Sequence, residues 1–173
     1  MARVPYLDDT IDPQLKPLCD RIRAERGGRV LNLYRALLNS QKVAEGWLHL
    51  FTAIRQQCEL PAQDRELVIL SVALLNGADY EYRAHVPFAL RAGLTQAQID
   101  DLSGWRESTR FDAKQRAVLE YCECMTRQVH VPDDVFARVA PHFDARRLVE
   151  LTATIAGYNL VSRFLEAMRI DHD

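Results

Sequence analysis

Apolar residues recur three and four positions apart along almost the whole chain, and this spacing limits the possible folds more than any other feature. Side chains at this spacing lie on one face of an α-helix. Val43, Trp47, Leu50, Phe51 and Ile54 follow it, which predicts one buried stripe. No stretch of four or more residues combines apolar–polar alternation with an excess of β-branched residues, the pattern typical of a half-buried strand. The sequence therefore predicts an all-α fold.

Cap and turn residues predict where the helices begin and end. We expect helices that begin near Asp12-Pro13, Leu31, Ser40, Asp64, Asp79, Thr95, Phe111-Asp112, Pro132 and Asp144. Ser40, Asp79 and Asp144 are expected to cap their helices, and Thr95 with Gln98 is expected to form a capping box. Helix ends are expected at Gly27-Gly28, Asn76-Gly77 and Gly93, and the last helix is expected to reach Met168.

Length and composition fit one globular domain over residues 1–173, with its core motif in residues 64–94. The chain has 48% hydrophobic and 27% charged residues, which excludes a disordered or collagen-like protein. A net charge of -2 without a basic block gives no reason to expect a nucleic-acid or membrane partner. The longest apolar run, residues 67–75, is too short to span a bilayer.

The cysteine pattern favours a reduced compartment. The four cysteines are Cys19, Cys58, Cys122 and Cys124. They include no CxxC pair and do not form a disulfide scaffold. Cys122 and Cys124 are expected on different faces of a helix, one in the core and one half-exposed. Because the N-terminal residues are polar, with no apolar stretch of a signal peptide, we expect a cytoplasmic protein.

Residues 64–93 collect polar side chains within an apolar setting. Glu81 and His85 are spaced i, i+4, so they share a helix face, and a carboxylate beside an imidazole is an arrangement used in general acid–base catalysis. Glu66 supplies a second carboxylate, and Tyr80 and Tyr82 add hydroxyl groups nearby. This segment is therefore the candidate for catalysis or ligand contact.

Simpler interpretations of these residues remain open. Glu66 and Glu81 lie in the first turns of helices, where the helix dipole favours any carboxylate. Glu81 and His85 could form a surface pair that contributes a few tenths of a kcal/mol. Pro87 cannot bond the carbonyl of Arg83, which implies a kink or an acceptor available to another group. No HExxH or Glu-x-x-His spacing exists, so no metal site is expected.

The stretch Arg65-Glu66-Leu67 … Gly77-Ala78-Asp79-Tyr80-Glu81-Tyr82-Arg83-Ala84-His85 … Ala89-Leu90-Arg91-Ala92-Gly93-Leu94 resembles the core of the carboxymuconolactone decarboxylase family, which includes the alkylhydroperoxidase D-like proteins. The resemblance extends to residues 32–37 and 156–159. It implies an alkylhydroperoxidase D-like helical fold.

In the peroxidase branch of that family, a Glu, a CxxC pair and a His relay protons to a thiolate. Glu66 and His85 fall at the places of the Glu and the His, whereas Ala78 and Glu81 occupy the cysteine places and Tyr80 replaces an intervening His. The resemblance therefore implies a decarboxylase-like lyase without a cofactor, acting on a small carboxylated or lactone substrate. In it a protonated side chain returns a proton to the dienolate that remains after carbon dioxide leaves.

In this interpretation His85 is the general acid–base, Glu81 its orienting partner, Glu66 a second carboxylate, and Tyr80 and Tyr82 bind substrate. A thiol peroxidase of the peroxiredoxin type is an alternative from the same family, disfavoured by the missing CxxC pair. A non-catalytic helical oligomer that binds a small ligand is the alternative from another class. The many apolar helices, together with the family's subunit packing, predict a homo-oligomer.

Glu66 and His85 are also expected to approach within direct or one-water hydrogen-bonding reach, in a pocket lined by Glu81 or Tyr80. The carboxylates should then raise the pKa of His85. Antiparallel packing alone is expected to leave the two residues roughly 10 Å or more apart. A crossing or kinked geometry, which Pro87 makes plausible, is therefore part of the hypothesis.

Overall fold

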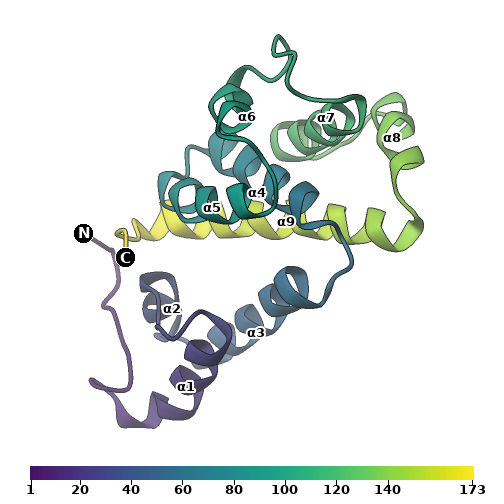
Figure 1. Cartoon of the computed structure of the whole chain (residues 1–173). Helices are drawn as coiled ribbons and strands as arrows, with labels where there is room; N and C mark the ends of the chain where they lie inside the picture. The colour runs from purple at the N-terminus through teal and green to yellow at the C-terminus, as the bar shows by residue number, and fades with distance from the viewer. The chain divides into compact units, whose positions relative to one another are not determined.

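The helical spacing of the sequence is realised throughout the computed structural model, which describes residues 1–173 and contains no strand (Figure 1). The all-α prediction is confirmed. The chain divides into two compact units, residues 1–57 with 165–173 and residues 58–164. The single domain expected over residues 1–173 stays a prediction. No helix is long and apolar enough to span a membrane.

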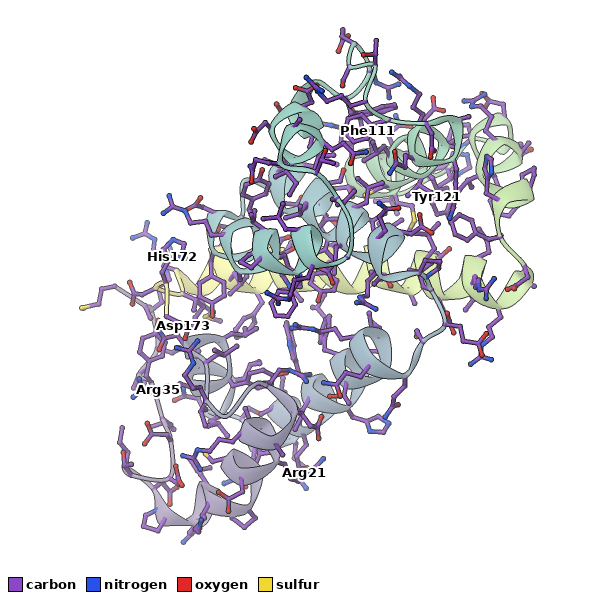
Figure 2. All side chains as sticks on the ribbon, viewed as in Figure 1. Arg21, Arg35, Phe111, Tyr121, His172 and Asp173 are labelled. Carbon is purple, nitrogen blue, oxygen red and sulfur yellow. The ribbon has the colours of Figure 1, made fainter.

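The first unit contains short helices and both ends of the chain. Its elements are η1 (Pro13–Leu15), α1 (Lys16–Glu25), α2 (Asn32–Leu37), α3 (Gln41–Thr52) and the π-helical turn η2 (Ala53–Gln57). The Asp12 carboxylate accepts a hydrogen bond from the backbone nitrogen of Gln14, so the predicted start of the first helix is confirmed. Asp173 accepts from the backbone nitrogen of Asn32 at 2.6 Å, which ties the C-terminal residues to α2 (Figure 2).

The buried face of α3 differs from the predicted stripe. Trp47, Phe51 and Ile54 are buried, but Val43 is 51% exposed and Leu50 is 44% exposed. The buried face is completed by Ala44 and Leu48 instead. Ser40 does occupy the N-cap position of α3, although its side chain makes no capping hydrogen bond.

The second unit is built around a central apolar helix. Its elements are α4 (Ala62–Asn76), α5 (Asp79–Arg91), α6 (Gln96–Asp101), η3 (Leu102–Gly104), α7 (Ala113–Gln128), α8 (Asp133–Val139), η4 (Ala140–His142) and residues 145–164 of α9 (Ala145–Met168). α4 packs against α5 and α7, and α9 runs alongside these helices in Figure 1. A run from Leu67 to Ala73 is buried on all sides of α4, which explains why this helix is apolar all round.

Local signals position most helix ends in this unit. Gly77 adopts a left-handed conformation with φ +69° and ends α4, so the chain reverses directly into α5. The capping box of Thr95 and Gln98 is confirmed, and Asp144 accepts from the backbone nitrogen of Arg147 as expected of a cap. Asp79 is not a cap, because Ala78 holds the N-cap position of α5.

α7 begins where the sequence predicts, directly after Phe111-Asp112. Asp112 caps the helix in a second capping box, and Ala117, Tyr121 and Cys122 are buried. Cys124 is buried as well, so the expectation that one of Cys122 and Cys124 would be half-exposed was wrong. The hydroxyl of Tyr121 lies 2.9 Å from Thr152 of α9 and links the two helices (Figure 2).

Candidate active site

The centre of the candidate site is a buried ion pair between α4 and α5. Nδ1 of His85 lies 2.8 Å from Oε2 of Glu66, and these residues are only 6% and 2% exposed. The expectation that the two side chains meet within hydrogen-bonding reach is confirmed. The simpler interpretation of Glu66, a carboxylate placed only by the dipole at a helix start, does not describe this geometry.

The turn at Gly77 explains how two residues 19 positions apart become neighbours. Glu66 lies ten residues before the end of α4, about 15 Å along the helix axis, and His85 lies six residues after the start of α5, about 9 Å along its axis. In a helical hairpin the backbone positions of Glu66 and His85 are therefore offset by only about 6 Å along the helix axes, a distance that two long side chains can span. The larger separation expected from antiparallel packing was therefore wrong, and α5 continues through Pro87.

The electrostatics of the pair fix the protonation of Glu66. Burial by itself raises the pKa of Glu66, but the hydrogen bond and charge of His85, with the adjacent Arg65, outweigh burial and lower it. Nε of Arg65 donates to Oε1 of Glu66 at 3.2 Å. Because an ionised carboxylate only accepts hydrogen bonds, Nδ1 of His85 carries a proton and donates it to Glu66. Nε2 is the other nitrogen of the ring that can gain or lose a proton.

Aromatic contacts hold the plane of the imidazole. The ring of Tyr158 on α9 meets His85 edge-to-face, with centroids 5.1 Å apart and an interplanar angle of 87°. The ring of Phe88, one turn along α5, lies 5.6 Å from His85. These contacts, with the Glu66 bond, restrict the rotation of the imidazole about its χ angles.

Glu81 provides a second buried carboxylate on α5. Its Oε2 accepts a hydrogen bond from the hydroxyl of Ser162 on α9 at 2.8 Å. Glu81 is expected to orient His85, and the 2.8 Å contact shows that Glu66 bonds the same imidazole. The role predicted for Glu81 stays a prediction.

The two tyrosines expected to bind substrate differ in their surroundings. The hydroxyl of Tyr82 donates weakly, at 3.4 Å, to the carbonyl of Ile99 on α6, and burial raises the pKa of Tyr82. Tyr80 is half-buried on the first turn of α5. A substrate-binding role stays a prediction for both.

Sequence reasoning assigned no site role to Tyr158 or Ser162. The i, i+4 spacing of these two residues puts them on one face of α9, and this is the sequence signal that could have identified them. Nothing in that spacing, however, indicates that the face packs on α5 rather than elsewhere.

The remaining nucleophilic groups are thiols that lie on other helices or loops than Glu66 and His85. All four cysteines are free thiols, and none lies on α4 or α5. Burial raises the pKa of the Cys122 thiol to about 12. Across residues 1–173, no three His, Cys, Asp or Glu side chains are arranged to hold a metal ion.

Comparisons with known proteins give a family model and a curated relative that match the sequence. The sequence model of the carboxymuconolactone decarboxylase family matches residues 41–123, which contain Glu66 and His85. The uncharacterized protein YdfG of Bacillus subtilis (strain 168) is 30% identical over 115 residues, which cover 65% of this chain and 78% of YdfG.

Solved structures give the same result for the fold. ATU0492 of Agrobacterium tumefaciens, a protein of unknown function described as a candidate antioxidant defence protein AhpD, aligns with a TM-score of 0.73 and 25% identity over 78% of this chain and 93% of its own. A variant of the debrominase Bmp8 in complex with 2,3,4-tribromopyrrole aligns with a TM-score of 0.82 over 100% of this chain and 92% of its own. Its 18% identity shows similarity of fold alone. The predicted alkylhydroperoxidase D-like helical fold is confirmed.

Proposed function

Because this chain belongs to the carboxymuconolactone decarboxylase family, we propose that it is a cofactor-free, decarboxylase-like enzyme for a small carboxylated or lactone substrate. The observation that carries the proposal is the buried contact between Glu66 and His85. A histidine held by an ionised carboxylate, away from solvent, is suited to giving a proton to a carbanion or enolate.

The proposed reaction needs only one proton from the protein. The bond between the substrate carbon and its carboxylate breaks, carbon dioxide leaves, and the electron pair enters a conjugated dienolate. His85 as the imidazolium donates the proton on Nε2 to a carbon of that dienolate, and solvent later restores the proton. Glu66 keeps Nδ1 protonated and stabilises the positive charge of the ring before the transfer.

The thiol chemistry of a peroxidase has little support in this chain. Ala78 and Glu81 stand where the peroxidase branch has its cysteines, and both residues are buried in α5 or at its start. The most deeply buried thiol on α7, Cys122, is held protonated by its surroundings. We therefore propose no redox step for this site.

The experiment compares turnover by the wild-type protein and by the variants Glu66→Gln and His85→Asn. Small lactone carboxylic acids are supplied in D2O, and carbon dioxide release and deuterium incorporation into the product are followed by NMR. Loss of a positioned general acid is expected to lower kcat by about 10²–10⁴-fold in His85→Asn. Glu107→Gln and His130→Gln change exposed residues of the same types and serve as matched controls.

Two results would overturn the proposal. One is turnover in His85→Asn equal to that of the controls. The other is an absence of turnover across the substrate panel together with saturable ligand binding, which would favour the non-catalytic ligand-binding oligomer.

A further inference from the structure

A row of three side chains on α5 leads from the buried imidazole to the protein surface. His85, Phe88 and Arg91 are spaced by three residues, so they lie along one ridge of the helix. The rings of His85 and Phe88 are 5.6 Å apart, and the guanidinium carbon of Arg91 lies 4.5 Å from the centre of the Phe88 ring. His85 is nearly buried, Phe88 is 40% exposed and Arg91 is exposed.

Arg91 is available for an external anion. Its guanidinium has no carboxylate within 4.0 Å, whereas Arg83 on the same helix is paired with Asp79 at 2.9 Å. The guanidinium carbon of Arg91 lies over the Phe88 ring, and the guanidinium N–H groups make no hydrogen bond to another side chain or to the backbone. These N–H groups can therefore bind a carboxylate, which accepts two parallel hydrogen bonds from an arginine.

The distances set the size of the molecule that could reach both ends of the row. Because the two contacts share the Phe88 ring, the guanidinium carbon lies at most about 10 Å from the centre of the imidazole. A small organic acid can cover this span, with its carbon skeleton against the part of Phe88 that is open to solvent.

From this arrangement we propose that Arg91 and Phe88 are the specificity-determining pair of the His85 site, and that they bind a substrate by a carboxylate and an apolar skeleton. This inference rests on the proposed function, since it takes His85 as the reacting group. The carboxylate on Arg91 is one that remains in the product. A guanidinium that held the departing carboxylate would stabilise the substrate more than the transition state and would slow decarboxylation.

Binding of simple probes tests the pair without any need for the natural substrate. Benzoate and its neutral analogue benzamide are titrated into the wild-type protein and the variants, with amide NMR shifts of residues 85–92 as the readout. Wild-type protein is expected to bind benzoate more tightly than benzamide. Arg91→Gln should weaken benzoate binding by roughly tenfold or more and leave benzamide binding unchanged, because a charge-assisted hydrogen bond is lost. Arg91→Lys keeps the charge but not the planar guanidinium group. Its affinity for benzoate should therefore lie between those of the wild-type protein and Arg91→Gln.

Arg83→Gln is the matched control, since it removes an exposed arginine from the same helix. Equal binding of benzoate and benzamide to the wild-type protein, equal effects of Arg91→Gln and Arg83→Gln, or no saturable benzoate binding would each overturn the inference.

The same variants separate this inference from the proposed function. In turnover assays, Arg91→Gln should raise KM with a smaller change in kcat, whereas His85→Asn should lower kcat. An Arg91-dependent preference for benzoate without turnover of any lactone acid would refute the proposed function alone. Turnover with a KM unaffected by Arg91→Gln would refute the Arg91 assignment alone.

Discussion

Replacing Glu66 with glutamine removes one negative charge from the buried pair and keeps the size and shape of the side chain. The carboxylate accepts from two donors, Nδ1 of His85 at 2.8 Å and Nε of Arg65 at 3.2 Å. The side chains of Glu66 and His85 are 3% and 8% exposed, so water screens their interaction little. The amide oxygen of glutamine can replace only one of the two acceptor atoms. A hydrogen bond to a charged group contributes about 1.5–3 kcal/mol, so we expect Glu66→Gln to lower the free energy of unfolding by about that amount at neutral pH.

The negative charge of Glu66 also makes the stability difference between the wild-type protein and Glu66→Gln depend on pH, in a direction that follows from the pKa of Glu66. The pKa of Glu66 lies below its ordinary value of 4.5, because the contacts with His85 and Arg65 outweigh the opposing effect of burial. A carboxyl group with a lower pKa in the folded chain stabilises the fold above its unfolded pKa, and this contribution is lost as the pH falls through the folded value. The contribution of the Glu66 charge to the stability difference between wild-type protein and Glu66→Gln should therefore be present above about pH 4.5 and should be lost as the pH falls below it.

Urea unfolding followed by circular dichroism, repeated between about pH 7.5 and pH 3, measures this difference directly. Glu107→Gln removes an exposed carboxylate and should change stability by less than about 0.5 kcal/mol at any pH. A Glu66→Gln protein as stable as this control at neutral pH would refute the reasoning. So would a destabilisation that stays constant through the acid range.

Three further outcomes follow from the structure and the sequence. With dithiothreitol as reductant, peroxide consumption by the wild-type protein should not exceed that by Cys58→Ser. Cys58 is the most accessible of the four cysteines, yet its partial burial raises its pKa and disfavours the reactive thiolate. Robust wild-type turnover that the substitution abolishes would show thiol catalysis. Asp112→Ala should lower the free energy of unfolding by about 1 kcal/mol, since it removes the cap of α7, and an unchanged urea midpoint would contradict this. Light scattering at micromolar concentration should give a mass above that of the 19.8 kDa chain, and a clean monomer would refute the predicted homo-oligomer.

Features that depend on neighbours in the sequence could be derived before the structure. The left-handed turn at Gly77 and the capping boxes at Thr95 and Asp112 involve atoms within a few residues of one another. Their geometry is set by local φ and ψ preferences and by short side-chain bonds to the backbone. For the same reason the all-α class and the start and end of α9 at residues 144–168 were accessible from the sequence alone.

Burial and site geometry depend on which helices pack together, and these were decided only by the tertiary structure. Val43 and Leu50 have the spacing of core residues but are exposed on α3. The periodic pattern alone does not indicate which side of the helix a neighbouring helix covers. Glu66 and His85 could be named from the sequence, yet their direct contact depends on the level at which α5 packs on α4. Tyr158 contacts His85 and Ser162 contacts Glu81, although the members of these pairs are 73 and 81 residues apart in the sequence. Local sequence preferences cannot predict contacts over such separations. The sequence determined which groups can carry chemistry, and the packing of α4, α5 and α9 determined which of them meet, because only long-range burial brings such distant side chains within hydrogen-bonding distance.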